Sequence, residues 1–449
     1  MSDSFSDVAP MLPAFALLPA LGLLTLIGIF ALWSAQGLAA RFVVFAIWMR
    51  LVLSALHVYT YAQVAGGLSI NALFSILVVG LGLLVIRKTL LLNKAALPIY
   101  LLIAVTLLSA MANSRVAPGL DVLIKYLYFL VIALATYQAL EEDYRGFGLS
   151  VLLAFSPLVL LQLISVVLNM PKTAPDGSIS YIGGYNHEAA FSVALVGLFF
   201  AACLAKGTNL VIRTIAMVAA AAGIWIANYR TAMIGILPLG FYASVMGVGR
   251  WVEPKLRAAV IIGMALLGFA LLVYALGTSE RFAEVGGLLR GEVDLLKPPE
   301  SFTAADQDLL SARAYIWSQY IYGWADGTSL QHLVGFGPNA WEEHFEIYAH
   351  NTFVGMLFDG GLLGVAAIVT LLGTGFVLAA RSGEFAPRLL AAHLSFLLLN
   401  MATMPFWLIE GLILYGYLWG HTMHAYYRRT PRLEFGPLPL RVVRFNGSL

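Results

Sequence analysis

The stretch "YAHNTFVGMLFDGGLLG", Tyr348–Gly364, places a histidine and an aspartate at the start of a long apolar run. Residues 352–380 are long and apolar enough to form a membrane helix, for which about 20 residues suffice. His350 would then lie at the boundary between water and lipid. Asp359 would lie within the membrane, where a carboxylate is costly unless it is paired or faces a cavity. Either a functional site or an interfacial histidine beside a face of small residues explains this pattern.

The rest of the chain has the composition of a membrane protein. Of its 449 residues, 60% are hydrophobic and 11% are charged, and the mean hydropathy is +0.85. Soluble domains carry about 25% charged residues. We therefore predict an all-α, polytopic transmembrane bundle of 12 or 13 spans. The predicted spans are 13–33, 40–60, 70–86, 96–112, 121–139, 148–169, 189–206, 209–227, 231–248, 257–276, 352–380, 388–404 and 406–427.

Lysine and arginine residues gather in alternate loops, and the positive-inside rule assigns those loops to the cytoplasm. On this basis the basic tail, 428–449, is cytoplasmic. The hydrophilic segment 277–350 then lies on the outer side, between N-terminal helices within 1–276 and C-terminal helices within 351–427. The single cysteine, Cys203, excludes a disulfide within the chain.

The segment 277–350 is longer than ordinary connections, which seldom exceed about 15 residues. Thr303 and Asp306 have the spacing of a capping box. A turn, "GFGPN", follows at Gly335–Asn339. The segment therefore predicts a structured cap over the outer face, containing a helix. The apolar stripe expected on that helix is Leu310, Ala314, Trp317, Ile321 and Trp324.

Three residues at the outer boundary suggest chemistry. His350 has an ordinary pKa of about 6.5, which suits a proton acceptor near neutral pH. Arg230 and Arg313 carry guanidinium groups, whose fork geometry suits phosphate oxygens. The alternatives are that Arg230 reaches to water and that Arg313 forms a salt bridge. The expected partners for that bridge are Asp306, Asp308 or Glu342.

Further candidate ligands lie nearby in the predicted topology. Asn351 either caps the helix that follows or orients a ligand. Asn186 and His187 open another helix, where His187 and Glu188 form either an acid–base pair or a helix cap. Lys125 is an intramembrane cation and therefore a functional candidate, or a partner for Glu410 or Asp359. No metal-ligand spacing or nucleotide motif occurs, so we expect neither a metal nor a cofactor.

Taken in order, these motifs resemble the O-antigen ligase and Wzy-type polymerase superfamily of bacterial inner membranes. The resemblance rests on "NYR", "SARAYIW", "GFGPN" and "HNTFVGMLFDGGLLG", and covers roughly residues 180–370. The first arginine differs from the usual pattern of serine and glycines, because here it stands in Tyr229-Arg230-Thr231.

The resemblance implies a metal-independent glycosyltransferase that acts at the periplasmic face. Its donor would be an undecaprenyl-diphosphate-linked glycan, and its acceptor a hydroxyl of lipid A–core or of a second lipid-linked glycan. By family analogy Arg230 and Arg313 would hold the diphosphate, and His350 would activate or orient the acceptor. Asn351, Asn186, His187, Asp359 and Lys125 would contact the substrates. Neither nucleic acid nor any particular oligomeric state is implied.

Several functions remain open from the sequence. Ligase and polymerase share this chemistry and differ in the acceptor, and ligase is the slightly preferred interpretation. A flippase for lipid-linked oligosaccharides also needs intramembrane charges, but the chain lacks the two similar halves that transporters often show. A cell-wall polymerase of the shape-and-division type would need one reactive acid, and the acids of the outer segment are too many to single one out. A structural scaffold would leave Arg230, Arg313 and His350 unexplained.

Overall fold

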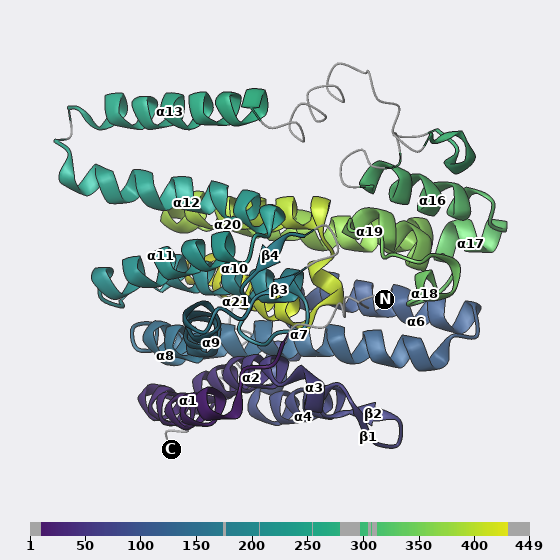
Figure 1. Ribbon diagram of the computed structural model, residues 1–449, viewed down its shortest axis with the longest axis horizontal. Helices are drawn as coiled ribbons and strands as arrows, with labels where there is room; N and C mark the ends of the chain where they lie inside the picture. Colours follow the sequence, from purple (N-terminus) through teal and green to yellow (C-terminus); the bar gives the residue numbers. More distant parts are fainter. Residues whose placement is uncertain are drawn as a thin grey trace, which may run out of the picture.

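The computed structural model describes residues 10–173, 177–205, 207–253, 255–278, 297–303, 307 and 312–429, and they form a bundle of helices (Figure 1). Two small antiparallel hairpins, β1–β2 and β3–β4, join some of them. The α-helices are α1 (Ala14–Ser34), α2 (Leu38–Ala55), α3 (His57–Thr60), α4 (Ile70–Val85), α5 (Lys88–Leu91), α6 (Leu97–Ala112), α7 (Val116–Glu142), α8 (Phe147–Ala154), α9 (Ser156–Val167), α10 (Glu188–Leu204), α11 (Leu210–Ile226), α12 (Arg230–Trp251), α13 (Arg257–Thr278), α16 (Arg313–Ala325), α17 (Ser329–Val334), α18 (Trp341–His344), α19 (Thr352–Ala380), α20 (Ala386–Ala402) and α21 (Ile409–Arg429). The strands are β1 (Gln63–Ala65), β2 (Leu68–Ser69), β3 (Lys172–Thr173) and β4 (Ile179–Ser180), and the short 3-10 helices are η1 (Lys94–Ala96), η2 (Pro299–Ser301), η3 (Gly383–Phe385) and η4 (Pro405–Trp407).

Each predicted span coincides with a described helix, except that the segment 40–60 is divided between α2 and α3, and the segment 148–169 between α8 and α9. The second of these breaks falls at Phe155, just before Pro157 in the first turn of α9, where proline is well tolerated. Seven helical stretches of the described chain are long and apolar enough to cross a membrane. The chain is therefore a multi-pass, all-α membrane protein, while 12 or 13 spans remains a prediction.

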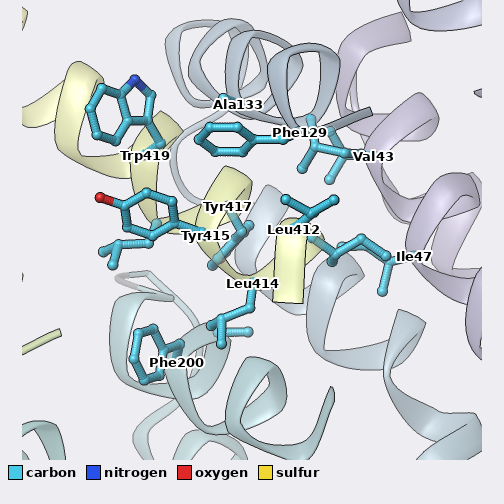
Figure 2. Close-up of a cluster of buried hydrophobic side chains, with 14 of the residues drawn as sticks. Val43, Ile47, Phe129, Ala133, Phe200, Leu412, Leu414, Tyr415, Tyr417 and Trp419 are labelled. Carbon is cyan, nitrogen blue, oxygen red and sulfur yellow. The ribbon is translucent and has the colours of Figure 1, made fainter. Parts of the chain in front are cut away.

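The core of the bundle lies where α7 and α21 pack along each other. Gly416 and Gly420, four residues apart on α21, face α7, and small residues at this spacing let two helix backbones approach closely. Side chains from α2, α7, α10 and α21 fill the space around this contact (Figure 2). The ring of Tyr415 stacks on Phe129 and on Phe396, with centroids 5.5 and 4.1 Å apart. This packing fixes α21, whose first residues reach the site described below.

Adding one methyl group at this contact should destabilise the bundle. A Cβ atom at Gly420 would lie 2.7 Å from the carbonyl oxygen of Ala133 and 2.6 Å from the Cβ atom of Thr136. Overpacking of this kind costs about 1–3 kcal/mol, so Gly420→Ala should lower the melting temperature in detergent. Gly373→Ala on α19 is the matched control, because nothing lies within 4 Å of its added Cβ atom. Equal melting temperatures for the two variants would contradict close packing at Gly420.

Loops predicted to be cytoplasmic lie together at one end of the bundle. Arg388 Nη1 donates to the carbonyl oxygen of Cys203 over 3.4 Å, and the guanidinium of Arg428 lies 5.7 Å above the ring of Tyr144. The other end, at the right of Figure 1, carries α16–α18 and the β1–β2 hairpin. This grouping agrees with the predicted alternation of loops along the chain.

Helix α16, Arg313–Ala325, corresponds to the helix that was predicted for the outer segment. The expected start at Thr303 and Asp306 cannot be compared, because Asp306 lies outside the described residues. In the described part, the buried face of α16 is Ala314, Ile316, Ser318 and Tyr320. Of the predicted stripe, Ala314 is buried and Trp317, Ile321 and Trp324 are half-buried, while Leu310 lies outside the described residues. The buried face packs against α19 and against rings from the loop before α19.

Candidate functional site

The start of α19 is held by Asn351, as the capping alternative predicts. Its Oδ1 atom accepts hydrogen bonds from the backbone nitrogens of Phe353 and Val354, at 2.9 and 3.2 Å. Its Nδ2 atom donates to the carbonyl oxygen of Met401 over 3.1 Å. Since both ends of the buried amide are engaged within the protein, Asn351 positions His350 beside it.

The glycines after Asp359 allow α19 to break and the turn Gly335–Asn339 to approach it. Gly361 has φ 62°, which interrupts the helical backbone. The carbonyl groups of Phe358 and Asp359 instead accept hydrogen bonds from Phe336 N and Gly337 N, at 2.9 and 3.0 Å. A side chain at Gly361 would collide with the turn, since its Cβ atom would lie 2.5 Å from Gly335 N. Gly361 therefore lets the helix bend and lets the turn approach its backbone closely.

Asp359 is buried at this break, 6% exposed. Its carboxylate lies beside the main-chain amides of residues 339–341, which surround it at the start of α18. Arg115 fixes the same turn from the α6–α7 loop, because its guanidinium donates to the carbonyl oxygens of Pro338 and Asn339. Within the described chain, Asp359 is thus enclosed by the "GFGPN" turn and lies apart from Lys125, so Lys125 is not its partner.

His350 occupies a strained position immediately before α19. Its backbone has φ 51°, a region that residues other than glycine seldom adopt. Its ring lies against that of Tyr348 at an angle of 40°, with centroids 3.9 Å apart, and its buried Nδ1 atom has no hydrogen-bond partner among the described residues. Burial and the nearby charges of Arg313 and His187 lower the pKa of His350 to about 4. At neutral pH it is therefore an uncharged ring with a nitrogen free to accept a proton or a hydrogen bond.

Arg313 lies close to His350, at the first residue of α16. The residue before it, Ala312, has φ 64°, and such strain is often concentrated at functional sites. The Nη2 atom of Arg313 donates to Thr231 Oγ1 over 3.4 Å. No described residue forms a salt bridge with Arg313, so the expected pairing with Glu342 is absent from the described structure. Asp306 and Asp308 lie outside the residues it describes.

Arg230 begins α12, next to the threonine that Arg313 contacts. Its side chain is exposed, and it pairs with none of the residues that the structure describes. The residue Asn228, two positions earlier, has φ 52°, so a left-handed residue precedes this arginine as one precedes Arg313. Because Thr231 follows Arg230 and contacts Arg313, the two arginines lie near each other, and the side chain of Arg230 is open to solvent.

The start of α10 completes this group of residues. His187 caps the helix, because its Nδ1 atom accepts from the backbone nitrogen of Ala189 over 3.1 Å. Glu188 forms a salt bridge with Lys172, Oε2 to Nζ, at 3.1 Å. The charges of both residues act on His350. The structure thus brings together residues from α10, α16 and the loop before α19. We call them the outer cluster: His187, Glu188, Arg313, Tyr348 and His350.

A cavity of about 430 Å³ opens beside the outer cluster. Three predicted ligands border it, Lys125, Asn186 and His187, and both His187 and Tyr348 belong to its wall as well as to the outer cluster. Arg230, Arg313, His350, Asn351 and Asp359 do not border this cavity. Of the predicted site residues, Arg313 and His350 thus lie in the outer cluster, Lys125 and Asn186 border the cavity, and His187 does both. Arg230, Asn351 and Asp359 belong to neither group.

Two ion pairs border the cavity, and neither is the predicted one. Lys125 Nζ pairs with Asp121 Oδ2 at 2.8 Å, one helical turn earlier on α7. Glu410 Oε1 accepts from Arg50 Nε at 3.1 Å and from Ser54 Oγ at 2.8 Å. The suggestion that Lys125 pairs with Glu410 is therefore wrong, because Arg50 of α2 pairs with Glu410 and Asp121 pairs with Lys125.

The sequence interpretation overlooked Arg50, which belongs to a predicted span. A signal for it existed, since an arginine within a membrane helix needs a carboxylate partner and Glu410 was already recognised as an intramembrane acid. The aromatic residues Trp341, Tyr348 and Trp407 were overlooked as well. They come from three separate segments, and no spacing in the sequence brings them together.

Comparison with known proteins adds no assignment to this geometry. No protein-family model matches the chain, and no curated protein matches it either. The function proposed below therefore depends on the residues of the site and on the resemblance of their motifs.

Proposed function

We propose that this protein is a membrane glycosyltransferase of the O-antigen ligase type, which transfers a glycan from an undecaprenyl-diphosphate-linked donor to an acceptor hydroxyl. The observation that carries the proposal is the proximity of His350 and Arg313. A half-buried, uncharged imidazole with an unpartnered nitrogen lies beside a guanidinium that no described carboxylate neutralises. One group can accept a proton while the other stabilises an anion.

The proposed reaction exchanges one bond at the sugar carbon that bears the diphosphate. The acceptor hydroxyl attacks this carbon as its proton passes to His350, and the bond between carbon and diphosphate oxygen breaks. The leaving diphosphate takes the electron pair of that bond, and its developing charge is stabilised by Arg313 and by the exposed Arg230. Preorganised charge of this kind is often the largest contribution to catalysis. Neither a nucleotide nor a metal is needed to make the leaving group.

The proposed setting is the periplasmic face of a bacterial inner membrane, with the C-terminus in the cytoplasm. The basic loops support this orientation, since they lie at the end opposite the outer cluster. Lipid A–core is the proposed acceptor. A repeat-unit polymerase uses the same chemistry with a second lipid-linked glycan as acceptor.

Loss of Arg313 should lower transfer by about a hundredfold or more, the effect of removing one charge stabiliser. The assay follows transfer from purified undecaprenyl-diphosphate-linked glycan in detergent with a chelator present, and offers lipid A–core and lipid-linked glycan separately. Arg313→Lys should recover part of the rate, because lysine keeps the charge without the fork. Arg145→Ala is the control, since Arg145 is an exposed arginine at the opposite end of the bundle.

The acceptor that is used separates ligase from polymerase. A wild-type protein that forms no product with either acceptor, yet moves the donor across a vesicle membrane, would be a flippase.

A further inference from the structure

We propose that the cavity beside the outer cluster is the saccharide subsite, where a sugar ring of a lipid-linked glycan stacks between Trp341 and Trp407. This inference rests on the proposed function and assigns a substrate part to a cavity that the catalytic residues do not border. Its volume of about 430 Å³ falls within the range of roughly 300–1,000 Å³ that is usual for ligand sites.

The aromatic side chains of the cavity suit the faces of a sugar. Four phenol and indole rings border it, those of Tyr61, Trp341, Tyr348 and Trp407. The indoles of Trp341 and Trp407 are half-buried, so each leaves part of its surface uncovered. A pyranose ring has C–H groups on its faces, and these carry partial positive charge that the negative face of an aromatic ring attracts. Its hydroxyl groups point sideways, where a site must supply polar partners.

The charges of the cavity suit hydroxyl groups better than a diphosphate. Two cations, Arg50 and Lys125, border it together with three carboxylates, Asp121, Glu342 and Glu410. Each of the two cations is already paired with one of these acids. Such a lining repels a polyanion, whereas carboxylates accept hydrogen bonds from hydroxyl groups.

Arg50 offers donors to the same ligand. Its side chain is 9% exposed, and only its Nε atom is bonded to Glu410. None of the described residues accepts a hydrogen bond from its two Nη groups, although Arg50 borders the cavity. Buried donors of this strength are normally satisfied, so a ligand oxygen is the partner we assign to them.

The cavity also leads toward the proposed reacting groups. The ring of Trp341 meets Tyr348 edge-on, with centroids 6.1 Å apart, and the ring of Tyr348 in turn lies tilted against that of His350. A sugar held against Trp341 would therefore lie one ring away from His350. The diphosphate would remain outside the cavity, near Arg313 and Arg230.

The inference is tested with the purified full-length chain in detergent micelles by saturation-transfer difference NMR. The probe is the soluble oligosaccharide released by mild acid from undecaprenyl-diphosphate-linked glycan. The wild type should transfer saturation to ring C–H protons, and Trp341→Leu and Trp407→Leu should lose most of that signal. Trp225→Leu is the control, because Trp225 is 72% exposed on α11 and does not border the cavity. The melting temperature of each variant establishes that it is folded.

Transfer kinetics measured in parallel separate this inference from the proposed function. Loss of one stacking indole should raise KM for the glycan roughly tenfold, with kcat less affected. Transfer with KM unchanged in both folded variants, or a wild type that gives no NMR signal, would overturn the saccharide subsite and leave the function standing. Sugar binding that depends on Trp341 and Trp407, without any transfer, would retain the subsite and refute the glycosyltransferase.

Discussion

Transfer by His350→Asn should be slower than wild type by a factor of roughly 10²–10⁴, the contribution of a positioned general base. Asparagine is the informative substitution because it tolerates the left-handed backbone that residue 350 adopts. It can still orient an acceptor by hydrogen bonding, but it cannot take up a proton. A small loss in His350→Asn together with a large loss in His350→Ala would show that His350 orients the acceptor.

The pH dependence gives a second measure of the same residue. Burial, Arg313 and His187 lower the pKa of His350 to about 4 in the free protein. Because the neutral ring is the active form, kcat/KM should stay constant from pH 7 to pH 5 and fall as the pH decreases through about 4. Folding lowers this pKa, so between about 6.5 and 4 the unfolded chain binds a proton that the folded chain does not. The free energy of unfolding therefore decreases as the pH falls through this range.

A bound diphosphate changes this profile in a defined direction. Its negative charge offsets that of Arg313, so the pKa of His350 rises in the complex, and kcat should fall at a higher pH than kcat/KM does. Arg313→Ala should shift the kcat/KM midpoint upward for the same reason, since Arg313 is a cause of the lowered pKa. A midpoint unchanged in Arg313→Ala would contradict the proximity of the two groups. His332→Ala is the control for the His350 and Arg313 variants, because His332 lies on α17, where its ring forms a hydrogen bond with the carbonyl oxygen of Ala325.

The helical architecture is predictable from the sequence because lipid imposes a strong constraint on each segment separately. A span needs about 20 apolar residues, and its backbone must satisfy its own hydrogen bonds. The spans of α7 and α19 could therefore be located without knowing their neighbours. The break at Phe155 is a smaller matter of local backbone geometry, which an apolar run of constant composition does not reveal.

The site is only partly predictable, since it depends on which helices are neighbours. His350 and Arg313 were identified because polar residues at a membrane boundary are conspicuous. The pairing of Arg50 with Glu410 was not, because 360 residues separate them along the chain. Lys125 illustrates the same difficulty: an acid one turn away on its own helix is a closer partner than any acid elsewhere.

The buried face of α16 is a third feature that the sequence does not predict. The stripe through Trp317, Ile321 and Trp324 has helical spacing, yet α16 buries Ile316 and Tyr320 instead. Spacing identifies a helix but not the face that is covered, because both faces of α16 carry aromatic residues. The covered face is decided by Phe345 and Phe358, whose rings lie 4.1 and 5.5 Å from that of Tyr320.

Removal of the carboxylate at Glu410 should produce the largest loss of stability in the bundle. Arg50 and Glu410 have side chains 9% and 3% exposed, and Ser54 adds a second hydrogen bond to the same carboxylate oxygen. Breaking a buried pair leaves an uncompensated charge and costs about 3–5 kcal/mol. Glu410→Ala should therefore unfold at a markedly lower temperature in detergent, and at a lower fraction of denaturing detergent in mixed micelles.

Two further variants show whether burial is the cause of that loss. Glu141→Ala removes the partner of Arg87 in a pair whose side chains are 24% and 46% exposed, and exposed pairs contribute no more than about 1 kcal/mol. The double variant Arg50→Met with Glu410→Leu should recover most of the stability, because no charge then remains buried. A loss in Glu410→Ala no greater than that in Glu141→Ala would mean that water in the cavity solvates Arg50. The guanidinium would then need no ligand oxygen, so the same measurement bears on the saccharide subsite.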